Sequence, residues 1–367
     1  MIRTALTELL GIRYPVVQAA MGYVSGPRLA VAVSDAGGLG LIASATMSLA
    51  ELEKAIEETA GRTAGPFGVN LRADAPDAAE RVRLIVARRV PVASFAQAPK
   101  PELIATLKDA GVVTIASIGA RRHAEKAAGW GVDAVIATGG EGGGHVGAVP
   151  TSLLVPQVAA AVDIPVIAAG GFFDGRGLVA ALAWGAAGIA MGTRFLLTSD
   201  SPVADTVKQV YLAAGLDGTV VTRRVDGVPH RVLRTTMVDH LEGRGRAGTG
   251  LASGPRRAGA LARSARNAVA FWGVSGMGWR EMLRQGRDMR RGSGLSWGQV
   301  LMAANTPVLL RAAMVDGRTD LGLMSSGQVA GLIDDLPSCT ELIESIMAEA
   351  DATLGRLEGV RNARRVR

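Results

Sequence analysis

The chain of 367 residues is 48% apolar and carries a formal net charge of +7. A single cysteine excludes a disulfide framework and any multi-cysteine metal or iron–sulfur site, so we expect no metal. No apolar run reaches the roughly 18 residues of a membrane span, and we find no signal peptide after Met1, so we expect a cytoplasmic protein.

Eight short apolar segments rich in β-branched residues recur along the first 200 residues. We expect them to be strands: Pro15–Met21, Leu39–Ala45, Phe67–Leu71, Val90–Phe95, Val112–Ile118, Ala134–Ala137, Pro165–Ala169 and Gly188–Met191. Alanine-rich stretches with helical periodicity separate them, for example Leu49–Thr59, Ala79–Arg89, Pro101–Ala110 and Arg121–Gly129.

Alternating strands and helices predict a parallel sheet of the α/β class. Eight such units predict a TIM (β/α)8 barrel whose functional site lies at the carboxyl ends of the strands. An open doubly wound sheet is the alternative. That fold normally binds a dinucleotide through GxGxxG after its first strand, and the segment Gln18–Gly22 does not match this motif.

The pattern changes after Phe195, so we divide the chain into a barrel core, residues 1–199, and a C-terminal lid and flank, residues 200–367. For the second part we first predict a helix at Asp205–Ala214 and a strand–turn–strand over Thr219–Arg234 with its turn at Val225–Val228. We then predict a loop at Gly243–Pro255, helices at about 258–272 and 278–291, and a further element at Ser296–Ala304. The chain should end in a helix, Thr340–Leu354, and a frayed tail, Glu358–Arg367. Apolar helices in this third of the chain make a homodimer possible.

Residues 241–300 hold 11 arginines against three acidic residues, Glu242, Glu281 and Asp288. A nucleic-acid binder would usually interleave such a patch with aromatics or carry a known module, and we see neither, so we expect no nucleic-acid partner. Two interpretations remain. The stretch is either a solvated arginine-rich surface or a lid for an acidic small molecule, such as the phosphates of a CoA thioester.

A glycine run, Gly139–His145, follows the sixth expected strand. Its five glycines in six positions exclude a helix or a strand interior and let the backbone approach something flat or anionic. His145 ends the run, and an imidazole suits proton transfer near neutral pH. Glu141 lies inside the run, where we expect it to orient the loop.

Two more expected strands end on glycines. Gly170 and Gly171 follow the seventh strand, with Asp174–Gly177 opening a helix, and Gly192 and Thr193 follow the eighth. These two ends predict a phosphate site, with ordinary tight turns as the alternative. Together with the glycine run, they predict a cradle for a flavin.

These motifs resemble the FMN-dependent nitronate monooxygenase superfamily, formerly called 2-nitropropane dioxygenases. The matching segments are Pro15–Met21, Pro66–Asn70, Gly131–His145, Pro165–Gly171, Asp174–Gly177, Met191–Phe195 and Ser326–Pro337. The resemblance implies a barrel holding FMN and makes His145 the proton-transfer residue. The implied FMN contacts are Ala20, Met21 and Gly22 by their backbone, Asn70 toward the ring, Gly143 and Gly144 beside it, and Gly170, Gly171, Gly192 and Thr193 at the phosphate.

From the residues alone, Asn70 could equally cap a turn at the end of the third strand. Ser117, at the end of the fifth strand, also belongs to the implied flavin site. The nitronate-oxidising members often carry lysine there, so Ser117 removes a positive charge near the flavin and weakens a simple nitronate monooxygenase assignment.

The chain is still more similar to an actinobacterial branch that acts on CoA thioesters in steroid C/D-ring breakdown. The segments that carry this likeness are Glu141–His145, Ser199–Ser201, Gly215–Val228, His230–Thr235 and Leu301–Pro307. It implies an FMN oxidoreductase that alters ring unsaturation in a hydroxy-oxo-hexahydroindene carboxyl-CoA. One alternative is a nitronate monooxygenase that oxidises alkyl nitronates with oxygen. Another is an NAD(P)H-dependent enoyl-thioester or quinone reductase, for which we see no dedicated nicotinamide motif.

Overall fold

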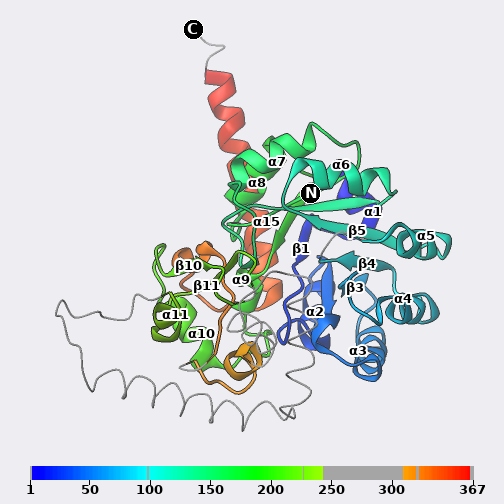
Figure 1. Ribbon diagram of the computed structural model, residues 1–367. Helices are drawn as coiled ribbons and strands as arrows, with labels where there is room; N and C mark the ends of the chain where they lie inside the picture. Colours follow the sequence, from blue (N-terminus) through cyan, green and yellow to red (C-terminus); the bar gives the residue numbers. More distant parts are fainter. Residues whose placement is uncertain (1, 97–98, 226, 243–308, 320–321, 364–367) are drawn as a thin grey trace, which may run out of the picture.

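The computed structural model describes residues 2–96, 99–225, 227–242, 309–319 and 322–363. Eight parallel strands form its central sheet in the order β1-β9-β8-β6-β5-β4-β3-β2. Their bounds are β1 Val16–Gln18, β2 Gly40–Ala43, β3 Phe67–Leu71, β4 Val92–Phe95, β5 Val113–Ile118, β6 Ala134–Thr138, β8 Val166–Ala169 and β9 Gly188–Met191. Each coincides with one expected strand, which confirms the TIM barrel (Figure 1).

The barrel closes between β1 and β2. Val17 and Leu39 form an isolated parallel bridge there, and the Leu41 amide donates to Gln18 Oε1 at 3.0 Å. Gln18 is fully buried, and its Nε2 donates to Ser25 Oγ at 2.7 Å. This buried amide therefore joins β1, β2 and the loop that carries Ala20–Gly22.

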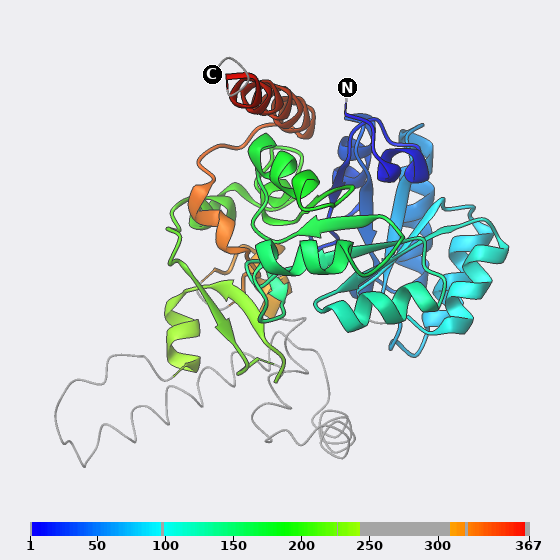
Figure 2. The ribbon, with the colours of Figure 1, turned by 90° about the horizontal axis from the view of Figure 1, so that it is seen from above.

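Helices surround the sheet, as Figure 2 shows from above. Their bounds are α1 Ala5–Leu10, α2 Pro27–Asp35, the 3₁₀ helix η1 Ser44–Thr46, α3 Leu49–Arg62, α4 Ala78–Ala87, α5 Pro101–Asp109, α6 Arg121–Gly129, α7 Thr151–Ala159, α8 Gly175–Ala183 and α9 Thr193–Leu196. Local sequence sets several of these ends. Ser48 and Glu51 form a capping box at α3, and Asp174 caps α8 by accepting from the Gly177 amide.

A second, three-stranded sheet lies beside the barrel. β10, Thr219–Thr222, pairs antiparallel with β11, His230–Leu233, which pairs antiparallel with β7, Gly144–His145. The sequence excluded a strand interior from the glycine run but did not predict this two-residue strand at its end, because β11 supplies a backbone partner that no local pattern reveals. The connection between β10 and β11 is also longer than the predicted turn and covers 223–229, with Asp226 outside the described residues.

The remaining elements are α10 Asp205–Leu212, α11 Thr236–Leu241, a helical turn at 309–314, the 3₁₀ helix η2 Gln328–Leu332 and α15 Cys339–Ala363. Because α15 continues to Ala363, the prediction of a frayed tail was wrong for 358–363. The predictions for Gly243–Pro255, 258–272, 278–291, Ser296–Ala304 and the arginines of 243–300 lie outside the described residues.

α15 packs across the barrel against α8 and then runs outward to the C-terminus (Figure 1). Gly175 makes this close approach possible, since a methyl group added there would lie 2.3 Å from the Ile346 carbonyl oxygen. Buried residues from both parts of the chain share one hydrophobic cluster, among them Val166, Tyr211 and Ile343. The boundary at residue 199 and the homodimer stay predictions.

Every helix in the described ranges is too short or too polar to cross a lipid bilayer.

Candidate functional site

The predicted site residues gather at the carboxyl end of the barrel, because the parallel strands end at the same rim. Ala20–Gly22 follow β1, Asn70 lies near the end of β3, and Ser117 near the end of β5. Gly170 and Gly171 follow β8, and Gly192 and Thr193 follow β9. Strand register therefore brings every one of these positions to one end of the molecule.

The glycine run packs tightly against the end of β8. Gly170 has a φ of +102°, which L-residues rarely adopt, and a methyl group there would lie 2.8 Å from Thr151 Oγ1. The same methyl group would lie 3.2 Å from both the Gly139 carbonyl oxygen and the Gly142 amide nitrogen. Only glycine allows β8 and the run to meet at this distance.

The other side of the run contacts a segment far along the chain. A methyl group at Gly143 would lie 2.6 Å from the Gly327 amide nitrogen, and the Gln328 amide donates to the Glu141 carbonyl at 2.9 Å. The Gly327 amide donates to Thr193 Oγ1 at 2.8 Å. Residues 326–328 therefore link the glycine run to the end of β9, joining two parts of the predicted cradle.

Glu141 fixes the loop to α7. Its Oε2 accepts from the Thr151 amide at 2.9 Å and from Thr151 Oγ1 at 2.7 Å, at the amino end of that helix. The Arg231 guanidinium donates to the Gly140 carbonyl from Nε at 3.1 Å and from Nη2 at 2.9 Å. Partial burial lowers the pKa of the Arg231 guanidinium below its usual value, and the nearby Glu141 carboxylate offsets part of that lowering. These contacts support the orienting role expected for Glu141.

His145 is exposed at the end of the run, and its ring faces a second histidine. The ring centroids of His145 and His230 are 4.7 Å apart with an interplanar angle of 53°. His230 is only 3% exposed, and its Nε2 lies 2.8 Å from Ser325 Oγ. The sequence prediction named His145 but gave no role to His230 or Ser325.

The predicted flavin contacts on the other strands differ in their burial and in the residues that they contact. Gly192 lies beside Met21, since a methyl group there would be 3.5 Å from Met21 Sδ. Asn70 is 9% exposed, and its Nδ2 donates to the Ser94 side chain at 3.3 Å. Ser117 is half-buried on β5. Asn70 thus contacts β4, and Ser117 lies on β5, the strand that pairs with β6 just before the glycine run.

Exposed backbone at the glycines fits a flat or anionic group. Gly143 and Gly171 are exposed, and Gly144 has a φ of +74° with open space where a side chain would be. Gly171 has a φ of +83°, and a methyl group added there would lie 3.6 Å from Glu141 Cβ. The rim therefore offers accessible backbone beside the one exposed imidazole among these residues, as a flavin cradle requires.

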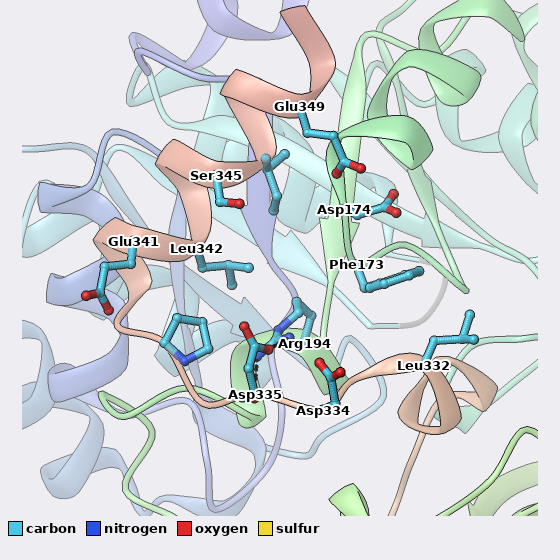
Figure 3. A pocket seen from close by; sticks show the side chains of 12 residues that line it. Phe173, Asp174, Arg194, Leu332, Asp334, Asp335, Glu341, Leu342, Ser345 and Glu349 are labelled. Carbon is cyan, nitrogen blue, oxygen red and sulfur yellow. Dashed lines mark hydrogen bonds and ion pairs between the residues drawn. The ribbon is translucent and has the colours of Figure 1, made fainter. Parts of the chain in front are cut away.

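Two cavities flank this arrangement, and neither is lined by His145 or by a predicted flavin contact. One of about 510 Å³ lies between the glycine run and the β10–β11 hairpin, where Arg223, Arg231 and Gln328 line it. The other, of about 420 Å³, lies between α8, α9, η2 and α15 (Figure 3). Acidic and apolar side chains line it, and Arg194 also lines it and donates to Asp335 Oδ1 at 2.6 Å. Neither is the expected flavin site.

One pattern in the sequence could have predicted that His230 is buried on a strand. His230 and Val232 alternate with Arg231 in a short apolar segment, which is the period of a half-buried strand. The pairing of that strand with the glycine run, however, joins residues far apart in the chain, so local periodicity gives no indication of it.

Comparisons with known proteins agree with this geometry. The sequence model described as "Nitronate monooxygenase" matches residues 3–82 and 79–349. A Mycobacterium tuberculosis protein named (3aS,4S,5R,7aS)-5-hydroxy-7a-methyl-1-oxo-octahydro-1H-indene-4-carboxyl-CoA dehydrogenase is 61% identical over 95% of this chain and 96% of its own. A Rhodococcus jostii protein of the same name is 56% identical over 98% of this chain and 99% of its own.

Among solved structures, FabK from Thermotoga maritima superposes with a TM-score of 0.79 and 34% sequence identity. The match covers 98% of this chain and 100% of FabK.

Proposed function

This chain belongs to the nitronate monooxygenase family of oxidoreductases, and on that premise we propose that it is a flavin enzyme that dehydrogenates the CoA thioester of an alicyclic ring substrate. The observation that carries the substrate class is the identity of 61% and 56%, over nearly the whole chain, with two dehydrogenases of one hydroxy-oxo-indene carboxyl-CoA. The exposed imidazole at the end of a glycine run supports the same chemistry.

We propose that the flavin is FMN, which supplies hydride-transfer chemistry when bound. The residues that would hold it are Ala20, Met21, Gly22, Asn70, Ser117, Gly143, Gly144, Gly170, Gly171, Gly192 and Thr193. Backbone amides of glycines suit a phosphate, and Gly144 leaves open space beside His145.

His145 moves the proton in this proposal. A carbon next to a thioester or ketone carbonyl is acidified, and a neutral imidazole within reach accepts its proton. Glu141 and Arg231 hold the loop that carries His145 and so orient the ring toward the substrate. The 11 arginines of residues 241–300 supply positive charge that matches the phosphates of CoA.

The absorption spectrum of the purified protein tests this proposal. We expect a flavin spectrum that CoA and a hydrindanone carboxyl-CoA thioester perturb, with affinity that falls as salt rises, because the attraction to phosphate is screened. The thioester should also bleach the flavin when oxygen is excluded. A spectrum indifferent to both compounds would contradict the proposal.

A matched pair of variants isolates His145. His145→Ala should keep the flavin and lose on the order of 100-fold or more in the rate of flavin reduction. His123→Ala, which removes an exposed histidine from α6, should change neither quantity. Loss of flavin from His145→Ala alone would make this residue structural instead.

The family match favours nitronate oxidation as a second candidate. Propionate-3-nitronate with oxygen should then turn over quickly, and negligible turnover eliminates it. An NAD(P)H-dependent enoyl-thioester or quinone reductase is a third candidate, which rapid flavin reduction by NADH or NADPH would support.

A further inference from the structure

The cavity between the glycine run and the β10–β11 hairpin is separate from the predicted flavin contacts. Its volume is about 510 Å³, and we call it the hairpin cavity. The charged side chains that line it are Arg223, Arg231 and Glu141. Residues of the glycine run and of 147–150 form the wall that faces the hairpin. Two guanidinium groups against one carboxylate give this cavity a basic lining.

Strand alternation directs the two arginines to one face of the hairpin. Val221 lies directly opposite Arg231 in the antiparallel pair, so their side chains project to the same side. Arg223 stands two residues after Val221, one beyond the end of β10, and lines the cavity with it. His230, on the other face, is buried. The hairpin therefore packs one face inward and turns a basic face to the cavity.

Arg231 is a half-buried cation that donates only to neutral oxygens. Its Nε and Nη2 donate to the Gly140 carbonyl at 3.1 Å and 2.9 Å, and its Nη1 donates to Thr219 Oγ1 at 2.9 Å. Burial is the larger influence on this guanidinium and lowers its pKa. A guanidinium carries five N–H groups, so Arg231 keeps donors for an acceptor in the cavity that it lines.

The carboxylate in the cavity wall does not neutralise these arginines. Glu141 Oε2 accepts from the Thr151 amide at 2.9 Å and from the Thr151 hydroxyl at 2.7 Å. Its effect on the pKa of Arg231 is smaller than that of burial. Arg223 is exposed, and neither arginine forms an ion pair with any residue of the described ranges. Guanidinium groups without a carboxylate partner, side by side in a cavity, suit a phosphate.

We propose that the hairpin cavity is a phosphate subsite and that its occupant is the nucleotide end of a CoA thioester. The choice of CoA rests on the function proposed above. Arg231 lies opposite Gly144, one position from His145, but its side chain leaves β11 on the face away from His230 and His145. The pantetheine arm of CoA likewise separates its phosphates from its thioester. One molecule therefore presents its acyl carbon to His145 and its phosphates to the two arginines.

Calorimetric titration of the purified holoprotein with CoA tests the subsite without turnover. Arg223→Gln should weaken CoA binding on the order of 10-fold, because it removes a charged donor to phosphate. Arg224→Gln is the matched control, since it removes the same charge from an exposed neighbour that does not line the cavity. It should leave the affinity unchanged. Unchanged CoA binding in Arg223→Gln, or equal weakening in both variants, would overturn the inference.

Arg231 gives a second test with a conservative partner. Arg231→Gln should weaken CoA binding on the order of 100-fold, and Arg231→Lys should restore part of it, because lysine binds phosphate as a point charge. Absorbance of the bound flavin shows whether the glycine run stays intact once the Gly140 carbonyl has lost its donor. CoA binding that Arg231→Gln leaves unchanged would contradict the inference.

Competition distinguishes CoA from other sources of phosphate. CoA and ADP should displace inorganic phosphate from the holoprotein, whereas pantetheine, which lacks phosphate, should not. Each displacement should weaken as salt rises. If inorganic phosphate binds through Arg223 but CoA fails to displace it, the cavity is a site for free phosphate and the assignment to CoA is wrong.

Turnover separates this inference from the proposed function. With the CoA thioester, Arg223→Gln should raise KM and keep kcat, because the contact stabilises the bound substrate and the transition state equally. With the pantetheine thioester of the same acid, the variant and the unaltered protein should share one KM. If the thioester leaves the flavin oxidised while CoA binding still depends on Arg223, the proposed function fails and the subsite stands. Flavin reduction with a KM that Arg223→Gln does not change would overturn the subsite alone.

Discussion

Gly170 occupies a position where both conformation and space demand glycine. Its φ is +102°, and its Cα faces Thr151 Oγ1 and the backbone of the glycine run. We expect Gly170→Ala to lower the free energy of unfolding by about 3 kcal/mol, since backbone strain and overpacking each cost about 1–3 kcal/mol. Urea unfolding measures the stability, and absorbance measures the flavin, which should be lost in part.

Gly111 provides the control for backbone strain alone. Its φ is +73°, but nothing lies within 4 Å of the position of an added methyl group. Gly111→Ala should therefore cost only about 1–2 kcal/mol and leave the flavin bound. Equal costs at the two positions would show that the close contact of β8 with the glycine run contributes nothing.

At the scale of elements, the contact between α8 and α15 depends on the absence of one side chain. A methyl group at Gly175 would lie 2.3 Å from the Ile346 carbonyl oxygen and 2.4 Å from the Ala350 amide nitrogen. We expect Gly175→Ala to push α15 off α8 and to destabilise the protein by about 3 kcal/mol in urea unfolding. Gly355→Ala, in the exposed part of α15, should instead stabilise by about 0.5–1 kcal/mol. A neutral Gly175→Ala would refute this view of the interface.

The eight barrel strands were predictable because each is buried on nearly all its length. Strands such as Val166–Ala169 are continuous apolar runs, and their local composition suffices to recognise them. β7 was not predictable, since two residues, Gly144 and His145, show no periodicity and are ordered by β11. The end of α15 was missed because charged residues suit a frayed tail and an exposed helix equally.

The candidate site could likewise be predicted in part from the sequence and in part not. Positions at strand ends, such as Gly170 and Gly192, could be predicted because the barrel places all strand ends on one rim. The contacts that complete the rim could not. They come from residues 326–328 and from His230, whose places depend on how the second part of the chain packs on the first.

At the scale of the whole molecule, Cys339 reports whether the C-terminal part stays attached to the barrel. It is the only cysteine of the chain, begins α15 and is fully buried. Burial raises the pKa of its thiol to about 12. We expect a disulfide reagent at pH 8 to label the native protein on the order of 1,000-fold more slowly than the unfolded protein, because the thiolate fraction is lower by about that factor. Rapid labelling of the native protein would mean that α15 detaches readily.

The pairing of β7 with β11 also sets an order of events during synthesis. All eight barrel strands lie before residue 192, so they leave the ribosome before the strand that receives His145. Translation proceeds from the amino terminus, and contacts between distant segments form late. In the nascent chain, the end of the glycine run therefore has no β11 strand to pair with until residues 230 and 325 have been synthesised. All eight barrel strands have therefore been synthesised before His145 and His230 can come together.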